Sequence, residues 1–169
     1  MASWQLDMYY MWRMEAIINT SSETETENLA AIIAERVRGG EVFLLESDLG
    51  GGKTVFARGL AKGLRSPDFV SSPTFTISQQ YNSPTFTIFH YDLYRLDQLG
   101  VIAEQIEEEI ESKIGIHVIE WPHLVENTVA KEIAIKVVIK RKKNSADSRE
   151  LIIEYPEELK YIFEGEFAV

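Results

Sequence analysis

Ser47-Asp48-Leu49-Gly50-Gly51-Gly52-Lys53-Thr54 is the stretch that decides the fold, because it has the pattern of a phosphate-binding loop. Its last three residues match the fixed positions of G-x-x-x-x-G-K-[ST], whereas Ser47 stands where that pattern has its first glycine. An apolar run of strand character, 42–45, comes directly before the loop, and apolar residues at helical spacing follow it over 55–64. Strand, loop and helix in this order favour phosphate binding over a glycine-rich turn with a chance lysine.

The residue types of this loop suit the phosphates of a nucleotide. Glycine tolerates the backbone angles that turn successive N–H groups inward, and the helix N-terminus that follows favours an anion. We expect Lys53 to reach the β- and γ-phosphates and the hydroxyl of Thr54 to ligate Mg²⁺. The predicted nucleotide-binding residues are Asp48, Leu49, Gly50, Gly51, Gly52, Lys53, Thr54 and Val55.

The rest of the chain alternates strand-like and helical segments, which is typical of an α/β protein. Strands are expected at 15–19, 42–45, 116–119, 133–139 and 149–155, and helices at 23–37, 55–64, 97–112 and from 156 onward. We therefore predict a single P-loop NTPase-like domain of three layers, with a mixed central β-sheet flanked by helices. This domain covers residues 14–169 and follows an N-terminal extension, residues 1–13.

Two copies of one hexapeptide, Ser-Pro-Thr-Phe-Thr-Ile, lie at residues 72–77 and 83–88. Each copy alternates polar and apolar residues as a half-buried strand does, and residues 81–84 offer a turn between them. The pattern predicts a β-hairpin whose second strand continues through Tyr91 and places Asp92 at its end.

Composition excludes several classes of function. The 169 residues, 45% of them hydrophobic, suit one globular domain, and without cysteine there is no disulfide or thiolate metal site. The net charge of -10 argues against autonomous binding to nucleic acid or to an anionic membrane. The basic cluster 140–143 is expected to be a solvated hairpin tip. No stretch has the length of a membrane span, and residues 1–13 lack the features of a signal peptide.

A phosphate-binding loop usually works with an acid at the end of a neighbouring strand, which helps to hold Mg²⁺. Glu120 follows the apolar strand 116–119, and Asp92 ends another strand. Both are expected at the C-terminal edge of the sheet, where α/β proteins bind ligands. One carboxylate would contact the metal, and the other would orient or deprotonate the attacking water. The alternative for each is a surface carboxylate or a helix cap.

Several other side chains have two interpretations. Trp121 would cover the nucleotide or a partner surface, or else be a core aromatic. Arg95 and Arg149 would offset phosphate charge, although a surface ion pair is the favoured interpretation for both. ATP is favoured over GTP because the sequence has no Asn-Lys-x-Asp signature for guanine. Three histidines lack metal-ligand spacing and are expected to be structural: His90, His117 and His123.

Four motifs, taken in order, resemble those of the TsaE (YjeE) family of bacterial ATPases. They are the loop at 48–54, Ser-Pro-Thr-Phe-Thr at 72–76, Tyr-Asp-Leu-Tyr-Arg-Leu at 91–96 and Ile-Glu-Trp-Pro at 119–122. The chain departs from the family at Ser47, where glycine is usual, and at Gly51, where alanine is common.

The resemblance implies a bacterial cytoplasmic protein that is needed to make N6-threonylcarbamoyladenosine in tRNAs that read codons beginning with A. In that family the protein hydrolyses ATP, slowly when alone, while bound to a TsaD–TsaB transferase complex, and it supports turnover of that complex. Contact with tRNA would then be indirect, through the complex, which agrees with the acidic composition.

The resemblance also assigns roles by position. Lys53 and Thr54 would contact the phosphates and Mg²⁺, and Glu120 would be the second Mg²⁺ contact. Asp92 would be a catalytic or switch carboxylate, and residues 72–76 a switch-type loop near the γ-phosphate. Thr26 and the start of its helix would lie near the base. The expected catalytic residues are thus Asp92, Lys53 and Glu120.

Two other functions fit the same loop. In the first, the protein is a nucleotide-gated binding module, in which ATP orders residues 72–81 for docking and turnover is incidental. In the second, it is a small-molecule kinase, although the sequence offers no Arg-rich lid segment.

Overall fold

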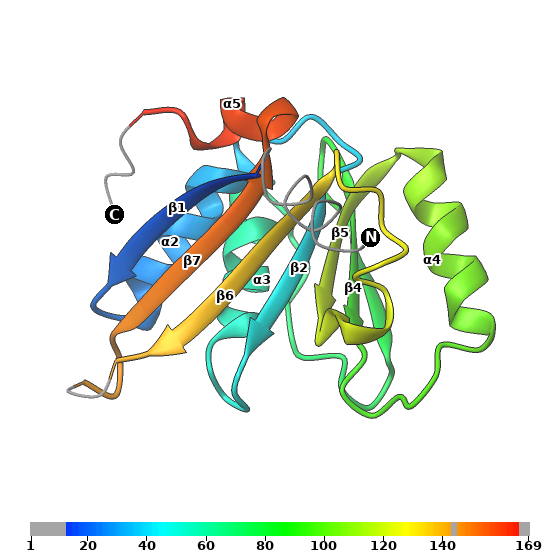
Figure 1. Ribbon diagram of the computed structural model, residues 1–169, viewed down its shortest axis with the longest axis horizontal. Coiled ribbons are helices and arrows are strands. Elements are labelled where there is room, and N and C mark those ends of the chain that lie inside the picture. Colours follow the sequence, from blue (N-terminus) through cyan, green and yellow to red (C-terminus); the bar gives the residue numbers. More distant parts are fainter. Residues whose placement is uncertain (1–12, 143–144, 166–169) are drawn as a thin grey trace, which may run out of the picture.

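A seven-stranded β-sheet forms the centre of the computed structural model, which describes residues 13–142 and 145–165 (Figure 1). The strands are β1 (Arg13–Thr20), β2 (Val42–Ser47), β3 (Ser78–Tyr81), β4 (Thr87–Asp92), β5 (Gly115–Glu120), β6 (Ala134–Arg141) and β7 (Arg149–Pro156). They lie in the order β1-β7-β6-β2-β5-β4-β3. Strands β6, β2, β5 and β4 run parallel to their neighbours in this group, whereas the outer pairs are antiparallel. The sheet is therefore mixed, as predicted.

Helices cover both faces of this sheet. Helices α2 (Glu23–Ala34) and α3 (Lys53–Gly63) lie side by side on one face, and α4 (Val101–Ser112) packs on the other (Figure 1). The short helices η1 (Pro122–Leu124), η2 (Glu157–Leu159) and α5 (Lys160–Phe163) complete the described elements. The predicted three-layer α/β architecture is thus confirmed. Among the described helices, none is both long enough and apolar enough to cross a membrane.

Strand β2 shows why the core has two halves. Its first four residues are all buried: Phe43 and Leu45 join the cluster beneath α2 and α3, and Val42 and Leu44 join the cluster beneath α4. Successive side chains of a strand point to opposite faces, so a central strand covered on both faces needs an uninterrupted apolar run.

The functional motifs meet where β2, β4 and β5 end. These strands are parallel, and Glu120 is paired in register both with Leu45 and with Asp92. Helix α3 begins at Lys53, directly after the loop that leaves β2. The phosphate-binding loop and both predicted carboxylates therefore come from one edge of the sheet.

The predicted hairpin of two hexapeptides is wrong in its first half. Strand β3 begins only at Ser78, and residues 72–77 form a turn closed by two backbone hydrogen bonds to the carbonyl of Pro73. In the second copy, the Ser83 hydroxyl bonds to the backbone of Phe86, and β4 begins after it. Proline and serine supply local turn bonding that competes with the strand ladder, so alternation alone misplaced the strand.

Other predicted boundaries shift by a few residues. Strand β1 begins at Arg13, inside the predicted extension, whose other residues, 1–12, lie outside the described part. Helix α4 begins at Val101 rather than at 97, because Gly100 adopts φ +54, a backbone conformation outside the helix. Helix α2 ends at Ala34, earlier than its apolar pattern indicated.

Candidate functional site

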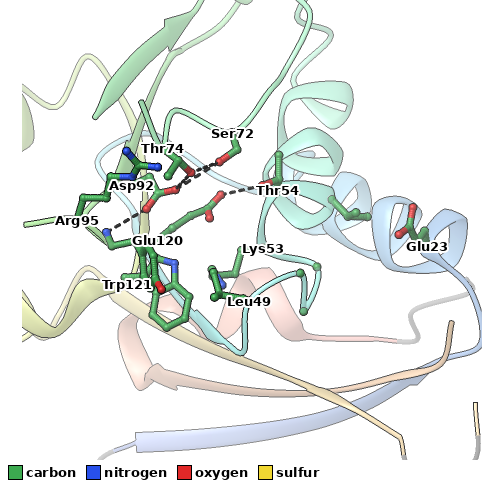
Figure 2. Close-up of a pocket in the computed structure, with 15 residues that line it drawn as sticks. Glu23, Leu49, Lys53, Thr54, Ser72, Thr74, Asp92, Arg95, Glu120 and Trp121 are labelled. Carbon is green, nitrogen blue, oxygen red and sulfur yellow. Dashed lines mark hydrogen bonds between the residues drawn. The ribbon is translucent and has the colours of Figure 1, made fainter. Parts of the chain in front are cut away.

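A cavity of about 460 Å³ lies at the edge where β2, β4 and β5 end (Figure 2). The phosphate-binding loop and the start of α3 form one wall, and the ends of β4 and β5 with the residues that follow them form another. The lining residues are Glu23, Leu49, Gly50, Gly51, Gly52, Lys53, Thr54, Val55, Ser72, Thr74, Asp92, Tyr94, Arg95, Glu120 and Trp121. The loop and both carboxylates therefore share one cavity.

The phosphate-binding loop adopts a backbone that glycine favours, and two arginines hold it from outside. Gly50 (φ +67) and Gly52 (φ +117) lie in the left-handed region. From the β6–β7 hairpin, Arg141 Nη2 donates to the carbonyl of Gly50 (2.6 Å) and Arg149 Nε to that of Gly51 (2.9 Å). Because the C=O and N–H of a trans peptide point in opposite directions, the Gly52 N–H points away from Arg149.

The arginines differ from their expected roles. Arg149 is only 6% exposed, and its guanidinium also donates to the carbonyls of Ala146 and Ser148, so the predicted surface ion pair is wrong. Arg141 belongs to the basic cluster that was expected to be only a solvated tip, yet it contacts the loop. The Arg95 guanidinium lies 4.4 Å from the ring centroid of Phe75, a cation–π contact where an ion pair was expected.

Ser47 and Gly51, where the loop departs from the family pattern, are in contact. A Cβ placed on Gly51 would lie 2.5 Å from Ser47 Oγ and 2.6 Å from Ser47 Cβ, which is too close for side-chain atoms. The Ser47 hydroxyl also donates to the carbonyl of Asp48 (2.9 Å) and accepts from Lys53 Nζ (2.9 Å). Ser47 therefore fits because residue 51 is a glycine.

Lys53 is a partly desolvated cation at the base of the cavity. Its Nζ lies within hydrogen-bond distance of Ser47 and 3.9 Å from the ring centroid of Trp121. Burial lowers the pKa of Lys53, and nearby carboxylates, chiefly Glu120, act in the opposite direction. A cation in these surroundings gains from a phosphate anion.

Trp121 belongs to the cavity and not to the core. It contributes to the wall, and its ring lies 4.9 Å from that of Tyr94, centroid to centroid. Its backbone adopts φ +57, a conformation that is unusual for a bulky residue and that is found at functional sites.

Glu120 is buried, and its side chain is held through one carboxylate oxygen. Thr54 Oγ1 donates to Glu120 Oε1 (3.2 Å), and His90 Nε2 lies 3.0 Å from the same oxygen (Figure 2 shows the Thr54 bond). Both bonds fall on the same oxygen, Oε1. Thr54 donates its hydroxyl proton to Glu120, so the lone pairs of Thr54 Oγ1 stay available for a cation.

Asp92 is held by hydroxyl groups of the preceding segment. Ser72 Oγ (3.3 Å) and Thr74 Oγ1 both donate to Oδ2, and the backbone N–H of Tyr94 donates to Oδ1 (3.0 Å) (Figure 2). Residues 72–76, which the resemblance indicated as a switch-type loop, thus lie directly against this carboxylate.

The oxygen atoms at this edge suit Mg²⁺. Thr54, Glu120 and Asp92 offer hydroxyl and carboxylate oxygens, which are the ligands that hard divalent cations prefer. The described residues contain no group of three or more His, Cys, Asp or Glu side chains that could hold a metal by themselves. Since Mg²⁺ in nucleotide sites relies on one or two protein groups plus phosphates and water, this sparse set fits a metal that arrives with a nucleotide.

Two of the predicted nucleotide-binding residues do not line the cavity. Residues 49–55 do, but Asp48 lies on the outer side of the loop, in a neighbouring cavity. Thr26 is buried, and its hydroxyl is 2.7 Å from that of Thr20, whereas Glu23 of the same helix reaches the cavity. A contact between Thr26 and a nucleotide base remains a prediction.

Sequence reasoning missed the position of His90. This residue was expected to be merely structural, but it is fully buried and bonds to Glu120. A signal existed, because His90 stands two residues before Asp92 on the same strand and the two side chains share one face.

His117 on β5 is structural, as expected. It is fully buried, neither ring nitrogen has a hydrogen-bond partner in the described part of the chain, and its ring stacks on Phe89 at 4.9 Å between centroids. Burial lowers the pKa of His117 to about 4.

Comparison with known proteins identifies the family. The family model described as "Threonylcarbamoyl adenosine biosynthesis protein TsaE" matches residues 20–152. The tRNA threonylcarbamoyladenosine biosynthesis protein TsaE of Bacillus subtilis is 37% identical over 126 residues, which are 72% of this chain and 75% of that protein. The protein of the same name from Nostoc sp. is 39% identical over 119 residues, 69% of this chain and 73% of that protein.

A solved structure agrees with this assignment. The crystal structure of Bacillus subtilis YdiB matches with a TM-score of 0.74 and 31% identity, and the match covers 90% of this chain and 93% of that chain. Fold, loop and sequence therefore lead to the same conclusion: this chain has a P-loop fold and belongs to the TsaE family.

Proposed function

We propose that this protein binds ATP with Mg²⁺ and hydrolyses it as a component of tRNA N6-threonylcarbamoyladenosine biosynthesis. The observation that carries the proposal is the single cavity that unites the glycine loop with Lys53, Thr54, Asp92 and Glu120. The names of the relatives support the pathway.

The loop supplies the phosphate site. Its backbone N–H groups and Lys53 would hold the β- and γ-phosphates at the start of α3. Thr54 and Glu120 would hold Mg²⁺, which when bound stabilises charge on the phosphoryl oxygens. Trp121 and Tyr94 would limit the access of water to this wall of the cavity.

Asp92 would orient or deprotonate the attacking water. Two hydroxyl groups, from Ser72 and Thr74, donate to Oδ2. A movement of residues 72–76 would therefore change what this carboxylate can accept, and it would couple the loop to hydrolysis.

The proposed partner is a TsaD–TsaB-type threonylcarbamoyl transferase complex, whose turnover the hydrolysis would support. With a net charge of -10, the chain is poorly suited to grip tRNA by itself. The tRNA would be reached through the complex, in the cytoplasm.

One observation favours a second candidate, a nucleotide-gated binding module with incidental turnover. The hydroxyl groups that hold Asp92 come from a segment whose Phe75 is 84% exposed, so a nucleotide that displaced them would also move an outward-facing aromatic.

The test is ATP hydrolysis measured with the protein alone, with the TsaD–TsaB complex, and with the complex and tRNA. We expect slow turnover alone and stimulation by the complex, with Lys53→Ala inactive throughout. Binding to the complex that depends on ATP but not on its hydrolysis would favour the gated module. An absence of ATP binding in calorimetry would overturn both proposals.

A further inference from the structure

Behind Glu120 lies a buried row of hydrogen-bonding side chains that the proposed function does not use. His90 Nε2 is 3.0 Å from Glu120 Oε1, and His90 Nδ1 is 3.2 Å from the hydroxyl of Tyr81. That hydroxyl is in turn 3.0 Å from the carbonyl of Ser71 and 2.7 Å from Gln79 Oε1. His90 is fully buried and Tyr81 is 4% exposed, so solvent does not compete for the two bonds of His90.

The sheet fixes the distance between the two main partners. Strands β4 and β5 are adjacent and parallel, with His90 opposite Val118 and Glu120 two residues further along. Side chains at i and i+2 of a strand share one face, so His90 and Glu120 both point to the face covered by α3. The geometry depends on two adjacent parallel strands rather than on a loop.

The imidazole of His90 has a partner at each ring nitrogen. A carboxylate only accepts hydrogen bonds, so Nε2 carries a proton toward Glu120. Nδ1 faces the hydroxyl of Tyr81, whose single proton is shared among Nδ1, the carbonyl of Ser71 and Gln79 Oε1. Both ends of the ring are therefore engaged, which fixes its orientation.

We infer that His90, oriented by Tyr81, is a positioning residue for Glu120: it anchors Oε1 and thereby leaves Oε2 to face Mg²⁺ and the nucleotide. The inference rests on the proposed function, in which Glu120 contacts the metal. Partners of this kind commonly contribute about 10–100-fold to metal affinity or activity.

His117 provides the matched control for this inference. It too is a fully buried histidine in the central sheet, but its ring has no hydrogen-bond partner among the residues that the structure describes. Replacing it should change stability and leave Mg²⁺-dependent binding unchanged, so a general effect of altering a buried histidine can be recognised.

The test compares His90→Gln with His90→Asn. The longer amide of glutamine can reach the place of Nε2 and donate to Glu120, whereas the asparagine amide reaches only the place of Nδ1. Calorimetric titration of a non-hydrolysable ATP analogue, with Mg²⁺ and with EDTA, measures the affinity gained from the metal. His117→Leu is measured in parallel, and thermal unfolding reports the fold of each variant.

We expect the Mg²⁺-dependent gain in nucleotide affinity to fall about 10-fold in His90→Asn and to be mostly kept in His90→Gln. The affinity measured in EDTA should be unchanged for both variants. Equal losses in both variants, or no loss in His90→Asn, would overturn the inference. If His90→Asn does not fold, Tyr81→Phe decides, with an expected loss of about 5-fold for one hydrogen bond and a contradiction if it binds as the wild type does. A wild-type protein that binds no Mg²⁺–nucleotide would refute the proposed function itself, whereas normal wild-type binding with unaffected variants refutes only the role of His90.

Discussion

Glu120 and Asp92 stand opposite each other on neighbouring strands, yet they are held in different ways. The bonds to Glu120 come from Thr54 on α3 and His90 on β4, both within regular elements. The side-chain bonds to Asp92 come from residues 72–76, an irregular segment between α3 and β3.

Because they are held differently, Glu120 and Asp92 are suited to different roles in the same cavity. Packed strands and helices open rarely, whereas irregular segments with exposed side chains open at low free-energy cost. We expect the Glu120 side to keep its geometry through a reaction cycle. The Asp92 side can change its hydrogen bonds, so regulation by a partner should act there.

The largest effect is expected on the Asp92 side. Asp92→Asn keeps the size of the side chain and removes the base, so ATP should still bind while hydrolysis falls by about 10²–10⁴-fold. Single-turnover hydrolysis and calorimetric binding, measured on the same preparation, separate the two effects. Wild-type turnover would show that Asp92 is neither base nor switch.

Burial of His117 on β5, the strand that also carries Glu120, should make the free energy of unfolding depend on pH. The pKa of His117 is about 4 in the folded protein against 6.5 unfolded, so the unfolded chain binds more protons between these values. Stability should therefore be complete above pH 6.5 and fall by up to about 3 kcal/mol as the pH drops toward 4. Denaturant unfolding of wild type and His117→Leu at several pH values measures this, and parallel profiles for the two proteins would contradict it.

The phosphate-binding loop on the Glu120 side should tolerate little change. Gly51→Ala forces a methyl group against Ser47, and overpacking of this kind costs about 1–3 kcal/mol. The double variant Ser47→Gly/Gly51→Ala removes the clash with Ser47 but keeps a 2.9 Å approach of the new Cβ to the carbonyl oxygen of Asp48, so it should recover part of the lost stability and nucleotide affinity. If the single and double variants unfold at the same denaturant concentration, the contact between the two positions has no energetic role.

The smallest effect should follow from loosening the segment at Asp92. Thr74→Val removes one hydroxyl donor and should cost about 1 kcal/mol of local stability. Faster amide hydrogen exchange confined to residues 72–77 would report this, with Thr128→Val as a control for losing an unrelated threonine hydroxyl. If amide exchange also became faster across β4 and β5, the Glu120 side and the Asp92 side would open together, which would contradict the separation proposed here.

The parts of the structure that were predicted correctly are formed largely by segments that follow one another directly in the sequence. The run from β2 through the loop to α3 is contiguous, so its strand, turn and helix signals reinforce one another. Glu120 and Asp92 each follow an apolar strand, and parallel strands place such ends together, which brought both into the cavity.

The parts that were missed depend on contacts between distant segments. Arg149 reaches the carbonyl of Gly51 across 98 positions of the chain, and no local pattern marks such a contact. The bond from His90 to Glu120 required knowing that β4 lies beside β5. Residues 72–77 alternate as a strand does, but the turn at Pro73 prevailed.

The contact between Ser47 and Gly51 constrains the order in which this loop can change during evolution. A loop with glycine at 47 and alanine at 51 differs from the present loop by two substitutions. Depending on which comes first, there are two possible intermediates. Glycine at both positions avoids the clash, whereas serine together with alanine is destabilised by about 1–3 kcal/mol. The route through the glycine pair is therefore the less strained one, because Gly51 leaves room for the side chain of Ser47.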